Sequence, residues 1–206
     1  MKILKLVAFL ALGLLMGSLS YAAKVGEAAP DFSAQGSDGK TYNLADLKGK
    51  WVVLEWHNAG CPFVVSQYKG KMQKLQAKWT KKGVKWFSVI SSAAGMEGAV
   101  TPDQANTDVQ NTNSHVTATF MDSDGTIGHA YGAKTTPHMF VIDPKGVLVY
   151  NGAIDNAPRE DAIETKTEAG DAYVNYVDKA LKEGLAGKAI TTPTNQPYGC
   201  GVKYSK

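Results

Sequence analysis

Two cysteines carry the most distinctive chemistry in this chain. Cys61 follows an apolar run that ends at Trp56, and Pro62 comes directly after it. Proline is favoured at the first position of a helix, so this pattern predicts that Cys61 lies where a strand gives way to a helix. The free N–H groups and partial positive charge of a helix N-terminus stabilise a thiolate, the reactive form of cysteine. The second cysteine, Cys200, lies six residues from the end of the chain.

Two histidines could adjust the acidity of Cys61. His57 precedes it by four residues, with Asn58 next in the chain, and His138 follows Pro137 in a later segment. A protonated imidazole close to the sulfur would favour the thiolate. A hydrogen-bonded polar residue at a strand end or loop edge explains each histidine about as well, because histidine pKa values respond to many environments.

Hydrophobic periodicity predicts the elements that must position these residues. Apolar and β-branched runs indicate strands at 51–56, 84–90, 117–121, 138–142 and 147–150. The last two runs flank the turn at 143–146, which is a hairpin signal. A βαβ unit followed by a hairpin and a helix predicts an α/β fold, with a mixed central sheet covered by helices on both faces.

Three helices are expected around this sheet. The first follows Cys61, and its apolar residues recur at spacings of three and four. These residues are Val65, Tyr68, Met72, Leu75 and Trp79. Thr101 and Pro102 are typical of the cap and first residue of a second, weaker helix. The last helix is expected over Ala169 to Lys182, with Gly184 as its stop.

The N-terminus has the pattern of a secretory signal. Lys2 and Lys5 precede an apolar run over 6–16, and small residues stand at both positions that a signal peptidase inspects before a cut after Ala22. We therefore predict a signal peptide over 1–22 and a periplasmic or secreted protein. The apolar run is short for a membrane span, so no membrane association is expected after cleavage.

The remaining chain suits one domain, expected over 23–184, followed by a Pro/Gly/Thr-rich tail over 185–206 that carries Cys200. Two of the 22 basic residues lie in the signal, which leaves 20 against 19 acidic residues. This near-neutral balance gives no support to nucleic-acid binding. Two cysteines in an exported chain make a disulfide feasible.

Several short motifs accompany the cysteine at the strand-to-helix junction. They are Ala29-Pro30-Asp31-Phe32, Gly39-Lys40, Leu47-Lys48-Gly49-Lys50 and the segment from Thr136 to Asp143. The combination resembles the thioredoxin superfamily, and within it the peroxiredoxin-like branch with the alkyl hydroperoxide reductase/thiol-specific antioxidant domain. The resemblance covers roughly Val25 to Leu181 and implies a thioredoxin-like fold.

The finer similarity is to an exported, peroxiredoxin-like subgroup. Its members have Cys-Pro-Phe-Val at the junction, here at 61–64, and Tyr-Gly-Cys-x-Val-Lys-Tyr in the tail, here at 198–204. The resemblance implies a cis peptide bond before Pro137, packed against the active-site cysteine. Together with the positions of the two histidines, this predicts the following active-site neighbourhood: His57, Asn58, Pro62, Thr136, Pro137 and His138.

Two departures limit what the resemblance implies. Thioredoxins have a second cysteine three residues after the first, where this chain has Val64. Peroxiredoxins have a proline and a threonine or serine seven and three residues before the peroxide-reacting cysteine, where this chain has Leu54 and Asn58. The resemblance alone therefore implies neither a local dithiol mechanism nor peroxidase chemistry for this chain.

The first functional hypothesis is a thiol-dependent oxidoreductase that needs no cofactor. Cys61 would act as nucleophile on a client disulfide or a small peroxide, and Cys200 would resolve the product. A reductant of unidentified nature would complete the cycle. This hypothesis expects a flexible, glycine-flanked tail, docked when required by Tyr198 and Tyr204, and a Cys61 sulfur that stays accessible.

Two alternatives remain open from the sequence. A permanent Cys61–Cys200 disulfide could serve only to fix the tail, since the chain-entropy estimate for so long a loop is about 5 kcal/mol. The protein could instead handle copper through four side chains with suitable donor atoms, although no Cys-x-x-Cys spacing is present. These side chains are His57, Cys61, His138 and Cys200.

Overall fold

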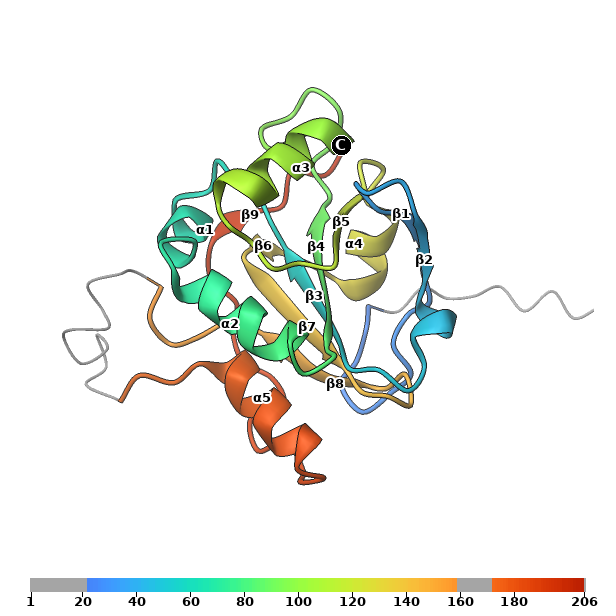
Figure 1. The fold of residues 1–206 in the computed structure, drawn as a ribbon, viewed down its shortest axis with the longest axis vertical. Helices are drawn as coiled ribbons and strands as arrows, with labels where there is room; N and C mark the ends of the chain where they lie inside the picture. Colours follow the sequence, from blue (N-terminus) through green and yellow to red (C-terminus); the bar gives the residue numbers. More distant parts are fainter. Residues whose placement is uncertain (1–21, 159–171, 206) are drawn as a thin grey trace, which may run out of the picture.

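The computed structural model describes residues 22–158 and 172–205, and a five-stranded sheet runs through its centre (Figure 1). The strands lie in the order β5 (Ala118–Met121), β4 (Lys85–Ile90), β3 (Val52–Trp56), β7 (His138–Ile142) and β8 (Leu148–Gly152). Strands β3, β4 and β5 are parallel, whereas β7 pairs antiparallel with both β3 and β8. The predicted mixed sheet and hairpin are confirmed.

Helices and short strands surround this sheet. The helices are α1 (Pro62–Gln67), α2 (Lys71–Thr80), α3 (Pro102–Asn111), α4 (Thr126–Tyr131) and α5 (Tyr176–Leu185). The short elements are β1 (Ser33–Gln35), β2 (Thr41–Asn43), the 3-10 helix η1 (Leu44–Leu47), β6 (Thr135–Thr136) and β9 (Cys200–Gly201). Figure 1 shows α2 and α5 on one side of the sheet and α4 with the β1–β2 hairpin on the other.

Each face of the sheet has its own hydrophobic core, because side chains alternate along a strand. In β3, Leu54 and Trp56 face α4, whereas Val53 faces α2 and α5. The α4 side is rich in aromatic rings: Phe32, Phe87, Phe120, Tyr131 and Phe140. The other side packs Met72, Leu75, Trp79, Trp86, Val177 and Leu181. Both faces of β3 are therefore buried, and Glu55 lies in this strand with no exposed surface.

The helix expected after Cys61 is two helices. It breaks at Gly70, whose φ of 112° is a conformation that side chains disfavour. Gln73 stabilises the break by accepting from the Gly70 N–H at 3.0 Å. The break turns α1 relative to α2, so Val65 is 47% exposed, whereas Met72 and Trp79 are buried as predicted.

The second expected helix is confirmed as α3, where Thr101 Oγ1 accepts from the Gln104 N–H at 3.3 Å. The last helix was expected from Ala169, and 169–171 lie outside the described residues; from 172 onward the helix begins only at Tyr176, where Asn175 caps it through the Asp178 N–H at 2.8 Å. It also runs through Gly184, where a Cβ atom would overlap the ring of Trp51. This glycine permits close packing and does not end the helix.

Residues 1–21, which hold almost all of the expected signal peptide, lie outside the described residues, as do 159–171. Across 22–158 and 172–205, no helix combines the length and apolar character needed to cross a membrane.

Candidate redox site

The turn between β3 and α1 places Cys61 at the N-cap of the helix, as predicted. Its φ of −76° and ψ of 122° are extended, and Pro62 is the first helical residue. Asn58 shapes the turn: its Oδ1 accepts from the Gly60 N–H at 2.9 Å, and its carbonyl accepts from the Cys61 N–H at 3.0 Å. Asn58 is buried and Pro62 is exposed, so their contribution is to position the cysteine.

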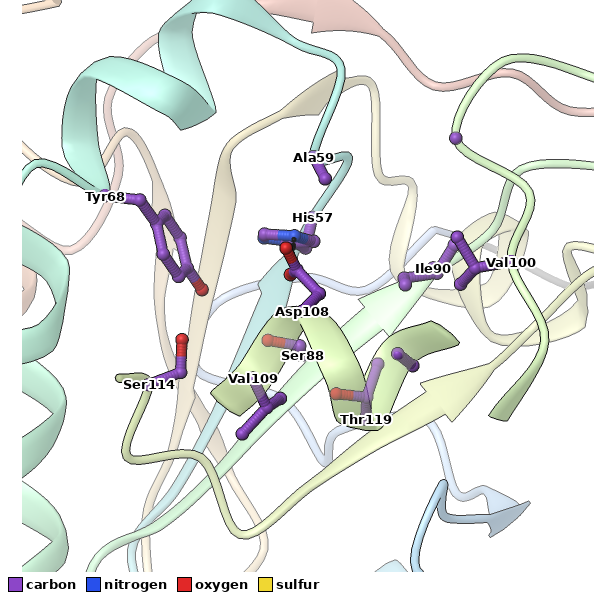
Figure 2. A pocket seen from close by; sticks show the side chains of 12 residues that line it. His57, Ala59, Tyr68, Ser88, Ile90, Val100, Asp108, Val109, Ser114 and Thr119 are labelled. Atoms are coloured by element: carbon purple, nitrogen blue, oxygen red, sulfur yellow. Dashed lines mark hydrogen bonds and ion pairs between the residues drawn. The ribbon is translucent and has the colours of Figure 1, made fainter. Parts of the chain in front are cut away.

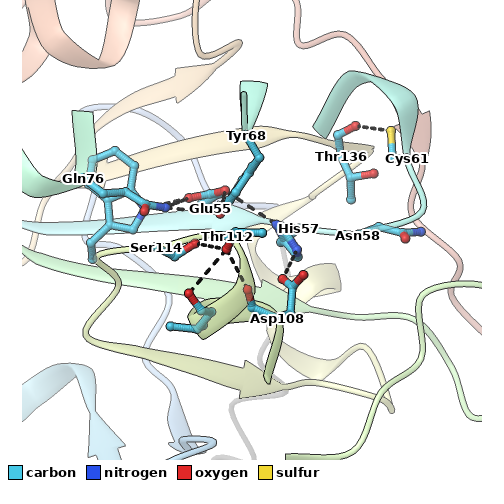
Figure 3. Close-up of polar contacts among 12 residues, drawn as sticks. Glu55, His57, Asn58, Cys61, Tyr68, Gln76, Asp108, Thr112, Ser114 and Thr136 are labelled. Carbon is cyan, nitrogen blue, oxygen red and sulfur yellow. Dashed lines mark hydrogen bonds and ion pairs between the residues drawn. The ribbon is translucent and has the colours of Figure 1, made fainter. Parts of the chain in front are cut away.

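The tail brings the second cysteine to the first. Cys61 Sγ lies 2.7 Å from Cys200 Sγ, and both cysteines are unbonded. Cys61 Sγ also lies 3.0 Å from the carbonyl oxygen of Thr136, its acceptor in Figure 3. β9 pairs antiparallel with β6, with Cys200 opposite Thr136, and the Thr136–Pro137 peptide bond is cis. Cys200 is thus positioned next to Cys61 both by the backbone pairing of β9 with β6 and by the contact between the two sulfurs.

Two tyrosines dock the tail, as expected. Tyr198 donates to Asp155 Oδ1 at 2.5 Å and accepts from Gln67 Nε2 at 2.8 Å. Tyr204 stacks on the His129 ring with centroids 4.1 Å apart, and its hydroxyl donates to the Ala133 carbonyl at 3.0 Å.

Glycines make room for the docked tail. A Cβ atom at Gly128 would overlap Tyr204, and one at Gly199 would overlap the Thr136 carbonyl. Gly199 also has a φ of 132°, which a side chain would disfavour. The structure therefore does not show the expected free tail around Cys200: the segment 195–204 is docked on the domain, whereas 186–189 are exposed.

Docking of the tail covers the Cys61 sulfur. Cys61 has 0% exposure, whereas Cys200 is half-buried. The expectation that Cys61 stays accessible is wrong for this arrangement, because Cys200 and Thr136 occupy the space next to the sulfur.

The two thiols differ in acidity. Burial raises the pKa of the Cys61 thiol, but hydrogen bonding with Cys200, the Val64 N–H and the Thr136 side chain outweighs it and brings the pKa below its ordinary value. Burial and the neighbouring Cys61 raise the pKa of Cys200 to about 11. Cys61 is therefore the more acidic thiol of the pair.

The histidines take no part in setting this acidity. Burial lowers the pKa of His57, but its hydrogen bond with Asp108 at 3.2 Å and the nearby Glu55 raise the pKa to about 9. Burial lowers the pKa of His138 to about 4, and its Nε2 lies 2.7 Å from Asn151 Oδ1. The expected imidazolium beside the sulfur is wrong, because each ring is held by a different partner.

His57 instead belongs to a buried polar network that the motifs did not reveal. Glu55 accepts from Tyr68 at 2.7 Å, Gln76 at 3.0 Å and Trp86 at 2.7 Å, and lies 3.8 Å from His57 Nδ1 (Figure 3). Glu55 was the one charged residue of an otherwise apolar strand, which is a signal that sequence reading could have used.

A cavity of about 40 Å³ lies beside this network, enclosed between the sheet and α3. His57 and Asp108 line it together with Tyr68 and Val109 (Figure 2). Its volume is enough for a few water molecules. The cysteines do not line it, so it is separate from the sulfur pair.

The four expected copper ligands do not converge. Cys61 and Cys200 meet, but the imidazoles of His57 and His138 are directed at Asp108 and Asn151. Among the described residues, no group of three His, Cys, Asp or Glu side chains could hold a metal ion. The geometry therefore gives the copper hypothesis no support.

Comparison with known proteins gives the family and the fold. A model of the AhpC/TSA family matches residues 25–151. No curated protein matches the sequence. Among solved structures, an uncharacterized conserved protein from Geobacillus kaustophilus superposes with a TM-score of 0.76 at 22% identity, covering 88% of this chain and 93% of that one.

Two further structures agree. A hypothetical protein from Sinorhizobium meliloti gives a TM-score of 0.74 at 22% identity, covering 90% of this chain and 97% of that chain. A putative thiol:disulfide interchange protein, DsbE, from Chlorobium tepidum gives 0.54 at 22% identity, covering 81% and 98%. At these identities the likeness shows the fold, and the predicted thioredoxin-like α/β fold is confirmed.

Proposed function

The chain belongs to the AhpC/TSA family, and we propose that it is a thiol-dependent oxidoreductase whose Cys61 and Cys200 alternate between dithiol and disulfide. The observation that carries this proposal is the 2.7 Å separation of the two sulfurs. A disulfide bond is about 2.05 Å long, so a small shift closes it. The backbone pairing of Cys200 with Thr136 keeps the partners in register while they react.

The oxidation step starts from the Cys61 thiolate once the tail, under which Cys61 has 0% exposure, has moved away from the sulfur. With a peroxide, its sulfur attacks the O–O bond, forms a sulfenic acid and releases an alcohol or water. The Cys200 thiol then displaces hydroxide from that sulfenic sulfur, which forms the disulfide and, with the thiol proton, one water. With a client disulfide, Cys61 forms a mixed disulfide and Cys200 releases the client as a dithiol. In both cases this protein loses two electrons, and external thiols return them.

The sequence motif at 1–22 leads us to place this chemistry in the periplasm or outside the cell. Disulfides form and persist in such compartments. A purified extracytoplasmic fraction containing a chain that begins at Ala23 would support this location, and recovery of the full chain from the cytoplasm alone would contradict it.

A structural disulfide is the second candidate, favoured by the burial of Cys61 and the close packing of the tail. In that case the bond would resist reduction by glutathione, whereas a catalytic bond equilibrates with it. Redox titration of the full chain in glutathione buffers separates the two functions.

The decisive experiment uses the fact that the chain has two cysteines. Treatment of the reduced protein with hydrogen peroxide or a peptide disulfide should lower its mass by two hydrogen atoms. Cys61→Ser should abolish turnover with both oxidants. Cys200→Ser should leave Cys61 as a sulfenic acid or mixed disulfide. Turnover that persists in Cys61→Ser, with the protein folded, would exclude the proposal.

A further inference from the structure

We propose that the buried carboxylate of Asp155 is a latch for the tail: it holds Tyr198, keeps β9 over Cys61 and thereby sets how fast that sulfur reacts. This inference rests on the proposed function, because the tail must leave Cys61 before a peroxide or a client disulfide can reach the sulfur. Asp155 is thus a positioning residue, which acts on the reaction through the tail.

The domain fixes the Asp155 carboxylate through contacts of its own. Asp155 lies shortly after β8 and is 1% exposed. Its Oδ1 accepts from the Ala157 N–H at 3.0 Å, and its Oδ2 accepts from the Tyr173 hydroxyl at 3.1 Å. An isolated antiparallel bridge joins Asp155 to Asn175, the residue that caps α5. The acceptor therefore has its position from residues that precede the tail in the chain.

The same carboxylate joins the tail to α1, the helix that Cys61 caps. Tyr198 in the tail donates to Asp155 Oδ1 at 2.5 Å. Gln67 in α1 donates to Asp155 Oδ2 at 3.2 Å and to the Tyr198 hydroxyl at 2.8 Å. The rings of Tyr198 and Phe63, which is also in α1, have centroids 5.9 Å apart. Tyr198 is therefore held against the helix that begins at the reactive sulfur.

The hydrogen bond from Tyr198 is the stronger of the two that the docking tyrosines donate. Burial and the neighbouring Asp155 charge raise the pKa of Tyr198, so its hydroxyl keeps its proton and donates. Hydrogen bonds to a charged acceptor are stronger than those between neutral groups. Tyr204, on the other side of β9, donates to the uncharged carbonyl of Ala133. Loss of the Tyr198 bond should therefore favour an open tail.

Opening of the tail limits any reaction at Cys61, which has 0% exposure while the tail is docked. When a segment opens and closes quickly compared with the reaction, the observed rate is proportional to the open fraction. A weaker bond between Tyr198 and Asp155 raises that fraction. The latch therefore predicts a variant whose Cys61 reacts faster than normal, whereas a residue that only supports the fold predicts no such gain.

The experiment follows the oxidation of Cys61 by hydrogen peroxide in reduced, full-length protein that carries Cys200→Ser, so that a single thiol reacts. The sulfenic acid is trapped with dimedone and quantified by mass. Tyr198→Phe removes the donating hydroxyl and keeps the ring. Cys61 should then be oxidised about tenfold faster, because a hydrogen bond to a charged group shifts an equilibrium by at least about that factor.

A second variant changes the acceptor. Asp155→Asn removes the charge and should also speed the oxidation of Cys61. The double variant Asp155→Asn/Tyr198→Phe should react at about the rate of the faster single variant, because both changes weaken one interaction. Urea unfolding verifies that each protein is folded. If Asp155→Asn does not fold, Tyr198→Phe decides the question by itself.

Tyr173→Phe is the matched control. It removes a tyrosine hydrogen bond from the same carboxylate, but Tyr173 lies before α5 and not in the tail. Its Cys61 should be oxidised at the rate of the Cys200→Ser parent. An unchanged or slower rate in Tyr198→Phe, or an equal gain in Tyr173→Phe, would overturn the latch and leave the proposed function intact. Failure of Cys61 to react with peroxide or a peptide disulfide in every protein, wild type included, would instead refute the proposed function.

Discussion

At the scale of single residues, position within a strand decides whether a polar group meets the sulfur or the core. His57 is four residues from Cys61, but the alternation of β3 directs it to the face that carries Glu55. There it pairs with Asp108 from α3. Acidity at Cys61 depends on hydrogen bonding with Cys200, with the Val64 N–H at the start of α1 and with the Thr136 side chain.

The pairing of His57 makes stability depend on pH. Its pKa is about 9 in the folded chain and about 6.5 in an unfolded one. The folded state therefore binds the extra proton between these values. The resulting stabilisation is complete below pH 6.5 and is lost as pH rises through 9. The free energy of unfolding, measured with urea, should fall across this window.

Asp108→Asn removes the carboxylate and should flatten that fall, whereas His115→Gln, at an exposed histidine, should leave it unchanged. An equal slope in wild type and Asp108→Asn would show that His57 is not the group responsible.

At the scale of elements, the docked tail completes the site. The tail follows α5 and is held at Asn195, Tyr198, Cys200 and Tyr204 in turn. Asn195 Oδ1 accepts from the Ala153 N–H at 2.6 Å, next to Gly152, where a Cβ atom would overlap it. A domain glycine therefore makes room for a tail side chain on each side of β9: Gly152 for Asn195 before it, and Gly128 for Tyr204 after it.

Gly128→Ala tests this fit. The helical backbone of α4 accepts alanine, but the new Cβ atom would overlap Tyr204. Loss of the docked tyrosine removes about 2 kcal/mol of buried apolar contact. This corresponds to about a thirtyfold larger open fraction of the tail. Cys61 of reduced Gly128→Ala should be alkylated faster by about that factor.

Tyr204→Leu should have the same effect with the glycine intact. Alkylation at the wild-type rate in both variants would mean that the tail does not limit access to Cys61.

The sequence predicts the local features of the site well and its long-range contacts poorly. A strand, a cysteine and a proline in succession were enough to place Cys61, because the signals are contiguous. The sequence did not predict the break at Gly70, because the apolar spacing continues across it from Tyr68 to Trp79. The sequence also did not predict that the tail buries Cys61, because this burial depends on contacts between distant segments that share no periodicity.

At the scale of the whole molecule, the sulfur pair joins two points 139 residues apart. The chain-entropy estimate for closing a loop of that size is about 5 kcal/mol. Oxidised wild type should therefore unfold at higher urea concentration than reduced wild type, with a difference of up to that amount. Cys200→Ser should match the reduced protein and show no change with oxidant. Equal stabilities of the oxidised and reduced forms, with the disulfide verified by mass, would contradict the loop argument.

Because Cys200 lies near the C-terminus, it is synthesised long after Cys61. With a sequence separation of 139 residues and elongation at about 5–20 residues per second, Cys61 leaves the ribosome about 7–28 s before Cys200 does. A nascent chain thus carries an unguarded nucleophile throughout this interval. Any ribosome-bound or partly translocated intermediate is open to mixed-disulfide formation between Cys61 and a foreign disulfide until Cys200 has emerged.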